Sequence, residues 1–301
     1  MPTEGKQRWA QWVRAMPAVF VLIWSTGFVV ARLAMPHAPA LTFLSWRYAF
    51  SILAFALWAG AAGARWPRGS SAWFHLCVSG VLMHAGYLGG VWTAVRAGIP
   101  AGTVALIIGL QPILTAAWET WRGSQHIAAS QWLGLGLGFL GLTVVVWQKF
   151  GAGQVTAVNL ALALLALACI TVGTLYQKRF VRADDTRTAN CIQLAAALLV
   201  SLPLAALETG TVQWVPATLV ALVWSVLALT LGGSSLLMIL IQRGAATRVT
   251  SLMYMVPPCT TLLAWGMFDE PITLVMILGM ALCALGVGLV MRRAAAPKPA
   301  A

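Results

Sequence analysis

Charged residues are scarce in this 301-residue sequence: they make up 9% of the chain, and only seven of them are acidic. A water-soluble domain carries about 25% charged residues, so this chain has too little polar surface to cover a soluble globule. Hydrophobic residues make up 60% of the sequence. They recur in stretches of about 20, which is the length that crosses the hydrocarbon core of a bilayer as an α-helix. The sequence therefore predicts an all-α polytopic membrane protein.

Asp and Glu are missing from the middle of every apolar stretch. A proton-driven antiporter usually keeps a carboxylate there for its proton relay. Proton coupling would therefore fall to His84, and the alternative, which we favour, is a facilitator. His84 also lacks an Asp, Glu or second His at ligand spacing, so we expect no metal, no cofactor and no enzymatic activity. The five cysteines all lie within apolar stretches, which excludes an extracellular disulfide framework.

Ten apolar stretches can be counted, separated by short polar segments that carry Gly, Pro and charged residues. The first stretch is long for the hydrophobic region of a signal peptide, and another span follows it at once, so we interpret it as a span. The expected spans are 17–35, 40–60, 70–95, 101–119, 130–147, 157–177, 188–207, 215–241, 249–268 and 271–291.

The basic residues fall mainly on one side of this topology. With the N-terminus inside, 15 of the 19 Lys and Arg residues lie on the inner side, three lie outside, and Arg47 lies within the second span. This positive-inside bias predicts a bacterial-type inner (plasma) membrane protein with both termini in the cytoplasm. The net charge of +12 is then an orientation signal. No nucleic-acid partner is expected, because the basic residues are scattered over loops and tails.

A faint internal repeat runs through the chain. Pro112 recurs as Pro257 and Gly141 as Gly286, each 145 positions later, and the text around both pairs is alike. Five spans in each half, an odd number, predict that the second half is inverted relative to the first. Inverted repeats can exchange two packings between the halves, which is the physical basis of alternating access. The expected halves are 1–148 and 149–301.

The opening of the chain, "IWSTGFVVARLAMPHAPALTFLSWRYAF", and the paired ends of the two halves resemble an EamA-type member of the drug/metabolite transporter superfamily. The resemblance covers essentially the whole chain and implies ten helices in two five-helix halves. Such proteins typically end the ninth span with a Leu-Gly-Glu-like tripeptide, where this chain has Phe268-Asp269-Glu270. The matching place in the first half, Gly123-Ser124-Gln125, lacks the acidic residue. The resemblance implies an exporter of amino acids or other small metabolites.

Two prolines mark the expected substrate site. Pro112 and Pro257 lie near the middle of the fourth and ninth spans, where a proline breaks a helix and frees a backbone carbonyl. Matched breaks in matched helices indicate the central site of a carrier, although a packing kink without a ligand is the alternative. Polar and amphipathic side chains at similar depth are the expected substrate contacts. They are Trp24, Ser25, His84, Tyr87, Trp92, Gln111, Thr171, Tyr176, Ser235 and Tyr254.

Arg47 lies about 10 Å inside the outer end of the second span, counting 1.5 Å for each residue. The plainer interpretation is that its side chain reaches outward to the interface beside Arg32. Alternatively it binds a backbone carbonyl or a substrate carboxylate at an outer gate, where Asp269 and Glu270 are possible partners.

Small residues recur at spacings of four and three residues in the fifth and tenth spans, and they predict a close helix contact. We expect this contact within one chain, and a dimer face is the alternative, so the protein is a monomer or a homodimer.

These features predict an inner-membrane transporter that works on a small-molecule substrate in the lipid bilayer. An amino acid is the leading substrate, because an aromatic-lined site without carboxylates suits a zwitterion with an apolar side chain. An exporter of lipophilic drugs or other metabolites is one alternative. A membrane enzyme or assembly subunit without transport is another.

Overall fold

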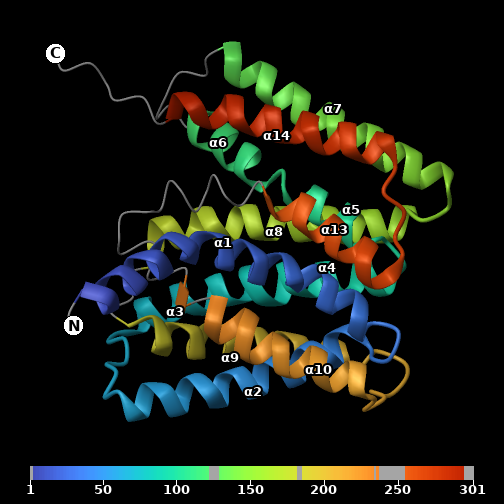
Figure 1. The fold of residues 1–301 in the computed structure, drawn as a ribbon. Helices are drawn as coiled ribbons and strands as arrows, with labels where there is room; N and C mark the ends of the chain where they lie inside the picture. The colour runs from blue at the N-terminus through green and yellow to red at the C-terminus, as the bar shows by residue number, and fades with distance from the viewer. Residues whose placement is uncertain (1–2, 122–128, 182–184, 234, 237–254, 295–301) are drawn as a thin grey trace.

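The protein is described by a computed structural model that covers residues 3–121, 129–181, 185–233, 235–236 and 255–294 (Figure 1). Within these residues the chain is helical and contains no strand. One expected substrate contact, Tyr254, lies outside the described residues, as do parts of the eighth and ninth expected spans. The structure bears out an all-α fold.

The first half begins with two unbroken helices, but its third and fourth spans are interrupted. The third span changes from an α-helix to a π-helix in its middle, and the fourth span is interrupted by a turn at Gly109 and Leu110. The elements of this half are α1 (Thr3–Ala34), α2 (Ala40–Ala61), α3 (Ser70–Gly80), η1 (Val81–Gly86), α4 (Tyr87–Arg96), α5 (Ala101–Ile108), α6 (Gln111–Trp121) and α7 (Ala129–Gly151).

The second half repeats this plan where it is described. Its third span also changes from an α-helix to a π-helix. Its fourth span is described from Met255 onward, and Pro257 lies in the first turn of a helix that begins at Val256. The elements are α8 (Ala157–Phe180), α9 (Thr186–Ala205), α10 (Pro216–Trp224), η2 (Ser225–Gly233), α13 (Val256–Phe268) and α14 (Leu274–Ala294).

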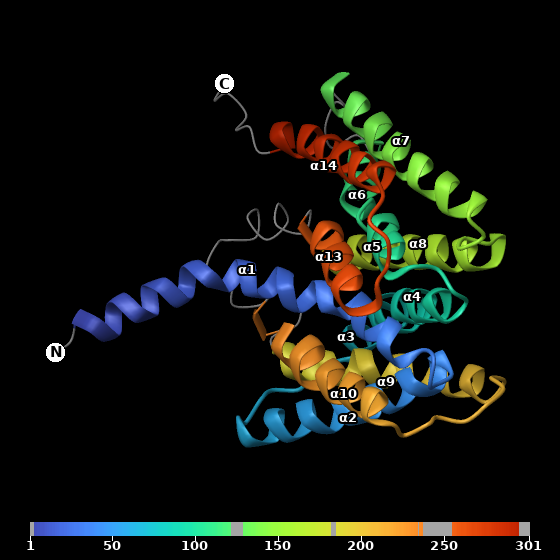
Figure 2. The ribbon, with the colours of Figure 1, turned by 45° about the vertical axis from the view of Figure 1, so that its right-hand side comes forward.

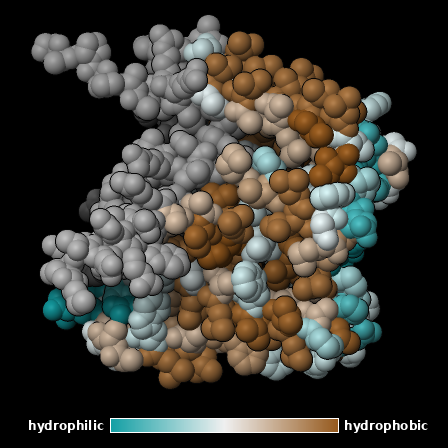
Figure 3. All heavy atoms as spheres, in the orientation of Figure 1, coloured by the Kyte–Doolittle hydropathy of each residue, from teal (hydrophilic) through white to brown (hydrophobic). Residues whose placement is uncertain are grey.

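Apolar side chains cover much of the surface. Among the described residues, six helices are long and apolar enough to cross a membrane. Their exposed faces carry large hydrophobic side chains such as Leu57, Phe74 and Leu199. Figure 3 shows hydrophobic residues across the middle of one face and hydrophilic residues along its right-hand edge. A soluble protein rarely exposes a continuous apolar surface of this extent, so these faces contact lipid.

Helix packing follows a two-fold plan. The second spans of the two halves pack together as α2 and α9, the fifth spans as α7 and α14, and the broken fourth spans as α5 and α13. Contacts between unlike spans also come in pairs: α1 packs on α13, and α8 packs on α5. These contacts are therefore related by exchange of the two halves.

Corresponding helices of the two halves run in opposite directions. In Figure 1, α1 runs from left to right and α8 from right to left, while α2 and α9 show the same opposition. Figure 2 shows α7 and α14 side by side, away from the bundle formed by α1, α2, α9 and α10. The fold is therefore a pair of inverted repeats.

Glycines make the contact between α7 and α14 possible. A Cβ atom on Gly141 would lie 2.5 Å from the carbonyl oxygen of Gly279, and one on Gly286 would meet the carbonyl oxygen of Gly134. Cys283 occupies the same seam, where its thiol donates to the carbonyl of Gly138 at 3.3 Å. The small-residue pattern thus packs two helices of one chain against each other.

The wide helical turns fall at equivalent places in the two halves. Shifted by 145 positions, η1 coincides with residues 226–231, which lie inside η2. Each is a π-helical segment, a rare geometry that is frequent at functional sites. The fourth spans meet at their own irregular point, because a Cβ on Gly109 would lie 3.1 Å from the Cγ atom of Pro257. Irregular backbone from both halves is therefore gathered at mid-span.

Candidate substrate-binding site

Arg47 is buried in the middle of the helix bundle. Its side chain comes from α2 and is only 6% exposed. Its Nε and Nη2 atoms donate to the hydroxyl of Thr230 on η2, at 3.4 and 3.2 Å. The guanidinium carbon lies 5.8 Å from the centre of the Trp92 ring, in cation–π geometry. The expectation that Arg47 reaches outward to the interface is therefore wrong, because η2 and α4 hold its side chain inside.

The charge of Arg47 is not balanced by a carboxylate in the described part of the chain. There the ion pairs join Arg32 to Glu270 and Arg187 to Asp185. The Thr230 hydroxyl donates its own proton to the carbonyl of Ser225 at 2.8 Å, so its oxygen acts only as an acceptor toward Arg47. A cation in an apolar interior is costly unless it is paired. The site therefore favours an anionic group.

Aromatic side chains of the first half surround this cation. Tyr48, Tyr87 and His84 all lie within electrostatic range of the guanidinium. The hydroxyl of Tyr48 donates to the backbone carbonyl of His84 at 2.9 Å, which anchors η1 to α2. Trp92 is fully buried and stacks on Phe43 with ring centres 4.9 Å apart. The ring of aromatics gives the site an apolar wall with several polar tips.

His84 has an unused polar atom. Its ring lies within reach of the side chain of Gln193 on α9, and its Nδ1 atom is buried without a hydrogen-bond partner among the described residues. The Gln193 amide nitrogen donates to Ser79 at 3.5 Å. In the neutral tautomer that carries its proton on Nε2, the Nδ1 atom of His84 presents a lone pair.

A second group of expected residues joins α1 to α13. Thr260 donates to the backbone carbonyl of Ser25 at 3.2 Å, and the buried Ser25 hydroxyl donates to Val21 at 2.7 Å. Trp24 lies beside Gly233 at the end of η2. Ser235 follows, with its hydroxyl bonded back to Leu231 at 2.6 Å. These side chains line the junction of the halves, and their hydroxyls bond mainly to backbone.

The remaining expected residues lie along α6 and α8. Gln111 donates to Thr174 at 2.9 Å, and Tyr176 hydrogen-bonds His75 at 2.6 Å. A cavity of about 550 Å³ lies between these two helices. Its lining is largely apolar and includes Trp118, Trp121, Thr171, Tyr176, Arg179 and Phe180. The expected substrate contacts are thus divided among three places, and only His84, Tyr87 and Trp92 share one with Arg47.

Polar contacts tie the helices together at the end that the charge bias places outside. Glu270 lies 3.7 Å from Arg32 and accepts from the backbone of Ala101 at 3.3 Å. Asp269 is exposed and ends α13 in a left-handed conformation. The expectation that these acids partner Arg47 is wrong, because Glu270 engages Arg32 instead. This end is also held by Glu208, which caps α2 through the backbone of Thr42 at 2.8 Å.

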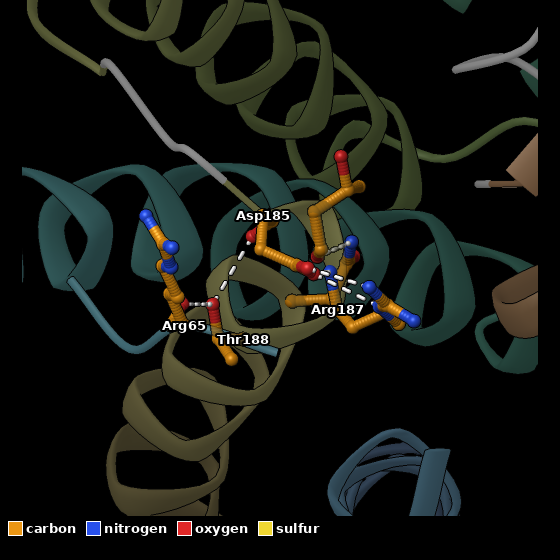
Figure 4. A network of polar contacts seen from close by, with 6 residues as sticks. Arg65, Asp185, Arg187 and Thr188 are labelled. Carbon is orange, nitrogen blue, oxygen red and sulfur yellow. Dashed lines mark hydrogen bonds and ion pairs between the residues drawn. The ribbon is translucent and has the colours of Figure 1, made fainter. Parts of the chain in front are cut away.

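The opposite end carries a smaller polar network, shown in Figure 4. Arg187 forms a bidentate pair with Asp185, with distances of 3.0 and 2.7 Å. Hydrogen bonds from Arg187 hold the pKa of the Asp185 carboxyl below its usual range. Thr188 donates to the backbone carbonyl of Arg65 at 3.1 Å. The network therefore joins the start of α9 to the loop after α2.

Sequence reasoning missed Thr230, Tyr48 and Gln193. Thr230 is one of many hydroxyls in apolar segments, and nothing in its sequence context sets it apart. Tyr48 adjoins Arg47, and Gln193 stands 145 positions after Tyr48, so the repeat register relates the two residues that approach His84. Comparing the halves position by position would have found this pair.

Known proteins resemble this chain in sequence and in fold. The EamA-like transporter family matches residues 14–147 and again residues 158–292. "Uncharacterized transporter YvbV" of Bacillus subtilis is 26% identical and covers 94% of this chain and 93% of its own length. A "Probable amino-acid metabolite efflux pump" of Escherichia coli is 22% identical over 88% of this chain and 90% of its own length.

A solved structure titled "Crystal structure of protein" has a TM-score of 0.65 at 18% identity, covering 93% of this chain and 98% of its own. This likeness concerns the fold alone. The two family matches, by contrast, span both halves and nearly the whole chain. The chain therefore belongs to the EamA-like transporter family and is a multi-pass membrane transporter.

Proposed function

We propose that this protein exports amino acids or closely related metabolites across a bacterial inner membrane, with both termini in the cytoplasm. The observation that carries the proposal is the buried guanidinium of Arg47, which sits among aromatic side chains between the two halves and lacks a carboxylate partner in the described chain. Such a site suits a small solute that brings its own carboxylate. The Escherichia coli relative named as a probable amino-acid metabolite efflux pump supports the same substrate class.

The proposed mechanism is alternating access between the inverted halves. Glu270, Arg32 and Ala101 close the expected outer end, whereas a cavity opens between α6 and α8. Breaking the outer contacts and closing the opposite end would expose a mid-span site to the other side. The segments that interrupt the spans, η1, η2 and the break at Gly109, are suited to act as hinges because their hydrogen-bond pattern is already irregular.

Facilitated movement down the substrate gradient is the proposed energetics. The sequence offers no Asp or Glu at mid-span for a proton relay, and His84 is the histidine that lies within electrostatic range of Arg47. A transport rate that is unchanged by a pH gradient would support facilitation. A rate that follows the gradient and loses this dependence in His84→Leu would instead indicate proton coupling.

An exporter of lipophilic compounds is the second candidate. The cavity between α6 and α8 favours it, because Trp118, Trp121 and Phe180 give that cavity an apolar lining. Such a substrate would not need the Arg47 site.

Counterflow in proteoliposomes separates the candidates. Vesicles loaded with unlabelled amino acid are expected to accumulate labelled leucine or phenylalanine, and neither nucleosides nor cationic dyes should compete. Arg68→Gln in an exposed loop is the matched active control. Vesicles without protein give the background rate. Failure of every amino acid to cross or compete would reject the proposal, and competition by dyes alone would favour the lipophilic exporter.

A further inference from the structure

Arg47 has hydrogen-bonding capacity that the protein does not use. A guanidinium carries five N–H donors, and the described chain takes two of them to one oxygen, the hydroxyl of Thr230. Both contacts exceed 3.1 Å, whereas charge-assisted bonds to a carboxylate are about 2.7–2.9 Å. Two carboxylate oxygens would fit the planar fork better than one neutral hydroxyl does.

His84 supplies an unused acceptor beside this cation. The Nδ1 atom is buried and unpaired among the described residues, and the side chain of Gln193 lies within reach of the same ring. A buried unpaired acceptor costs free energy that a ligand donor can restore. An ammonium group is a suitable donor, and the rings of Tyr48 and Tyr87 nearby offer it further cation–π stabilisation.

We propose that Arg47 and His84 form a two-point site for the zwitterion of an α-amino acid, in which Arg47 binds the carboxylate and His84 Nδ1 accepts from the ammonium group. The inference rests on the proposed function and names its recognition chemistry. The two groups come from α2 and η1, so both points belong to the first half. The unbalanced charge of Arg47 makes the carboxylate the stronger point.

Ligand binding at this site also bears on the contact between the halves. Among the described residues, Arg47 forms its hydrogen bonds to the second half with Thr230 on η2. A carboxylate that takes both prongs of the guanidinium displaces this hydroxyl, which keeps its bond to Ser225. Substrate would therefore release α2 from η2, as a carrier that moves its halves requires.

The test pairs truncated ligands with truncated residues. Purified protein in detergent is melted with phenylalanine, with phenethylamine, which lacks the carboxylate, and with hydrocinnamate, which lacks the amino group. The leucine series is run in parallel. Apparent Kd values follow from the dependence of Tm on ligand concentration. The wild type is expected to bind the amino acid more tightly than either fragment.

Arg47→Gln is expected to weaken the binding of phenylalanine at least about 30-fold. The Kd of phenethylamine should stay within about twofold of the wild-type value, since the amine does not use the guanidinium. His84→Leu is expected to weaken phenylalanine about tenfold and to leave hydrocinnamate unchanged. Arg47→Lys keeps the charge, loses the fork and should give an intermediate loss. The lysine variant also serves as the test if Arg47→Gln does not fold. Arg68→Gln and His37→Gln, both far from the site, should bind like the wild type.

Three results would overturn the site: equal binding of phenylalanine and phenethylamine by the wild type, unchanged binding of phenylalanine by a folded Arg47 variant, or no response of the wild type to any carboxylate. The site and the function can fail separately. Amino acids that cross proteoliposomes without the ligand–residue pairing would leave the proposed function standing and reject the site. If the ligand–residue pairing is seen in detergent but amino acids do not cross proteoliposomes, the site stands and the proposed function is rejected.

Discussion

The two π-helical segments occupy the same register of the repeat and differ in what they carry. In η1 the polar position is His84, followed by Tyr87, whereas 145 residues later η2 has Leu229 and Gly232. The same contrast holds on the neighbouring spans, where Arg47 of α2 corresponds to Ile192 of α9. Duplication thus preserved the irregular backbone in both halves. The proposed recognition groups Arg47 and His84 both come from one half, and among the described residues the other half contributes the Thr230 hydroxyl to Arg47.

This difference separates two requirements of a carrier. Exchange of two packings needs a backbone that is alike in both halves, and the glycine seam and the π segments meet that need. Specificity needs a binding site whose groups match one small solute. Because an amino acid is itself asymmetric, a site with the same groups on both halves would not match it. Changes to the shared scaffold should therefore affect stability, whereas changes to the asymmetric residues should affect binding.

The largest expected effect concerns the seam that both halves share. Gly141→Leu places a side chain against the backbone of Gly279 and should force α7 and α14 apart. Overpacking of this kind costs about 1–3 kcal/mol or more. The control is Gly136→Leu on the same helix, where a Cβ meets no atom within 4 Å. Thermal unfolding in detergent should show a large loss of Tm for the first variant only, and similar losses in both would contradict the seam.

The next effect concerns the hydroxyl that η2 contributes. Thr230→Val removes the acceptor that competes for the Arg47 guanidinium, and the empty site then leaves that charge less satisfied. Binding of a carboxylate ligand should therefore tighten by roughly tenfold, the equivalent of about one hydrogen bond. Ligand titration followed by Tm measures it. Weaker binding would mean that Thr230 contacts the ligand rather than competing with it.

A similar but smaller effect is expected at the anchor of η1. Tyr48→Phe removes the hydrogen bond to the backbone carbonyl of His84 and should cost about 1 kcal/mol of stability. Phenylalanine binding should weaken less than in Arg47→Gln, because the cation stays in place. Tyr176→Phe, which removes a hydroxyl bonded to His75 outside this group, is the control for losing a phenol in the bundle. Equal losses of binding in the two variants would show that Tyr48 does not position His84.

The outer contact should respond weakly. Glu270→Gln loosens the tie to Arg32, whose side chain is 41% exposed, so the loss is that of a surface ion pair, about 0.2–1 kcal/mol. The population with an open outer end should rise by less than about fivefold. Cysteine labelling of a substituted Ser25 in spheroplasts measures that population. A fall in labelling would contradict a closing role for Glu270.

The smallest effect concerns acid stability at the opposite end. The pKa of Asp185 is depressed in the folded protein by Arg187, so its contribution to stability is present above the unfolded pKa and is lost as the pH falls through the folded pKa. Asp185→Asn should flatten the decline of Tm on the acid side and leave the profile near neutral pH parallel to that of the wild type. An unchanged acid decline would show that other carboxylates govern it.

Much of the scaffold could be read from local patterns. Apolar length predicts helices because each span must satisfy its own backbone hydrogen bonds in lipid. The Gly141 and Gly286 register predicts the α7–α14 contact, because only small residues let two backbones approach this closely. Pro112 marks the end of a break that begins at Gly109, so the proline indicates the place but not the residues that lose the helical pattern.

The candidate site was only partly predictable. His84, Tyr87 and Trp92 were expected from their polar or amphipathic character at mid-span, and they do share one place. Gln111, Thr171 and Tyr176 look equivalent in sequence but line another part of the bundle. Their position depends on the rotation of each helix about its axis, which is set by packing against neighbours rather than by depth.

The sequence by itself determined that this protein is embedded in a bilayer, that it is helical, and that it consists of two inverted repeats. Composition, span length and the repeat register impose these features locally, whatever the neighbours do. Only the tertiary structure decided that Arg47 points inward, toward Thr230 and Trp92, rather than outward to the interface or to Glu270. A long side chain on an apolar helix can take either course, and which partner lies within reach is fixed by the helices that pack around it.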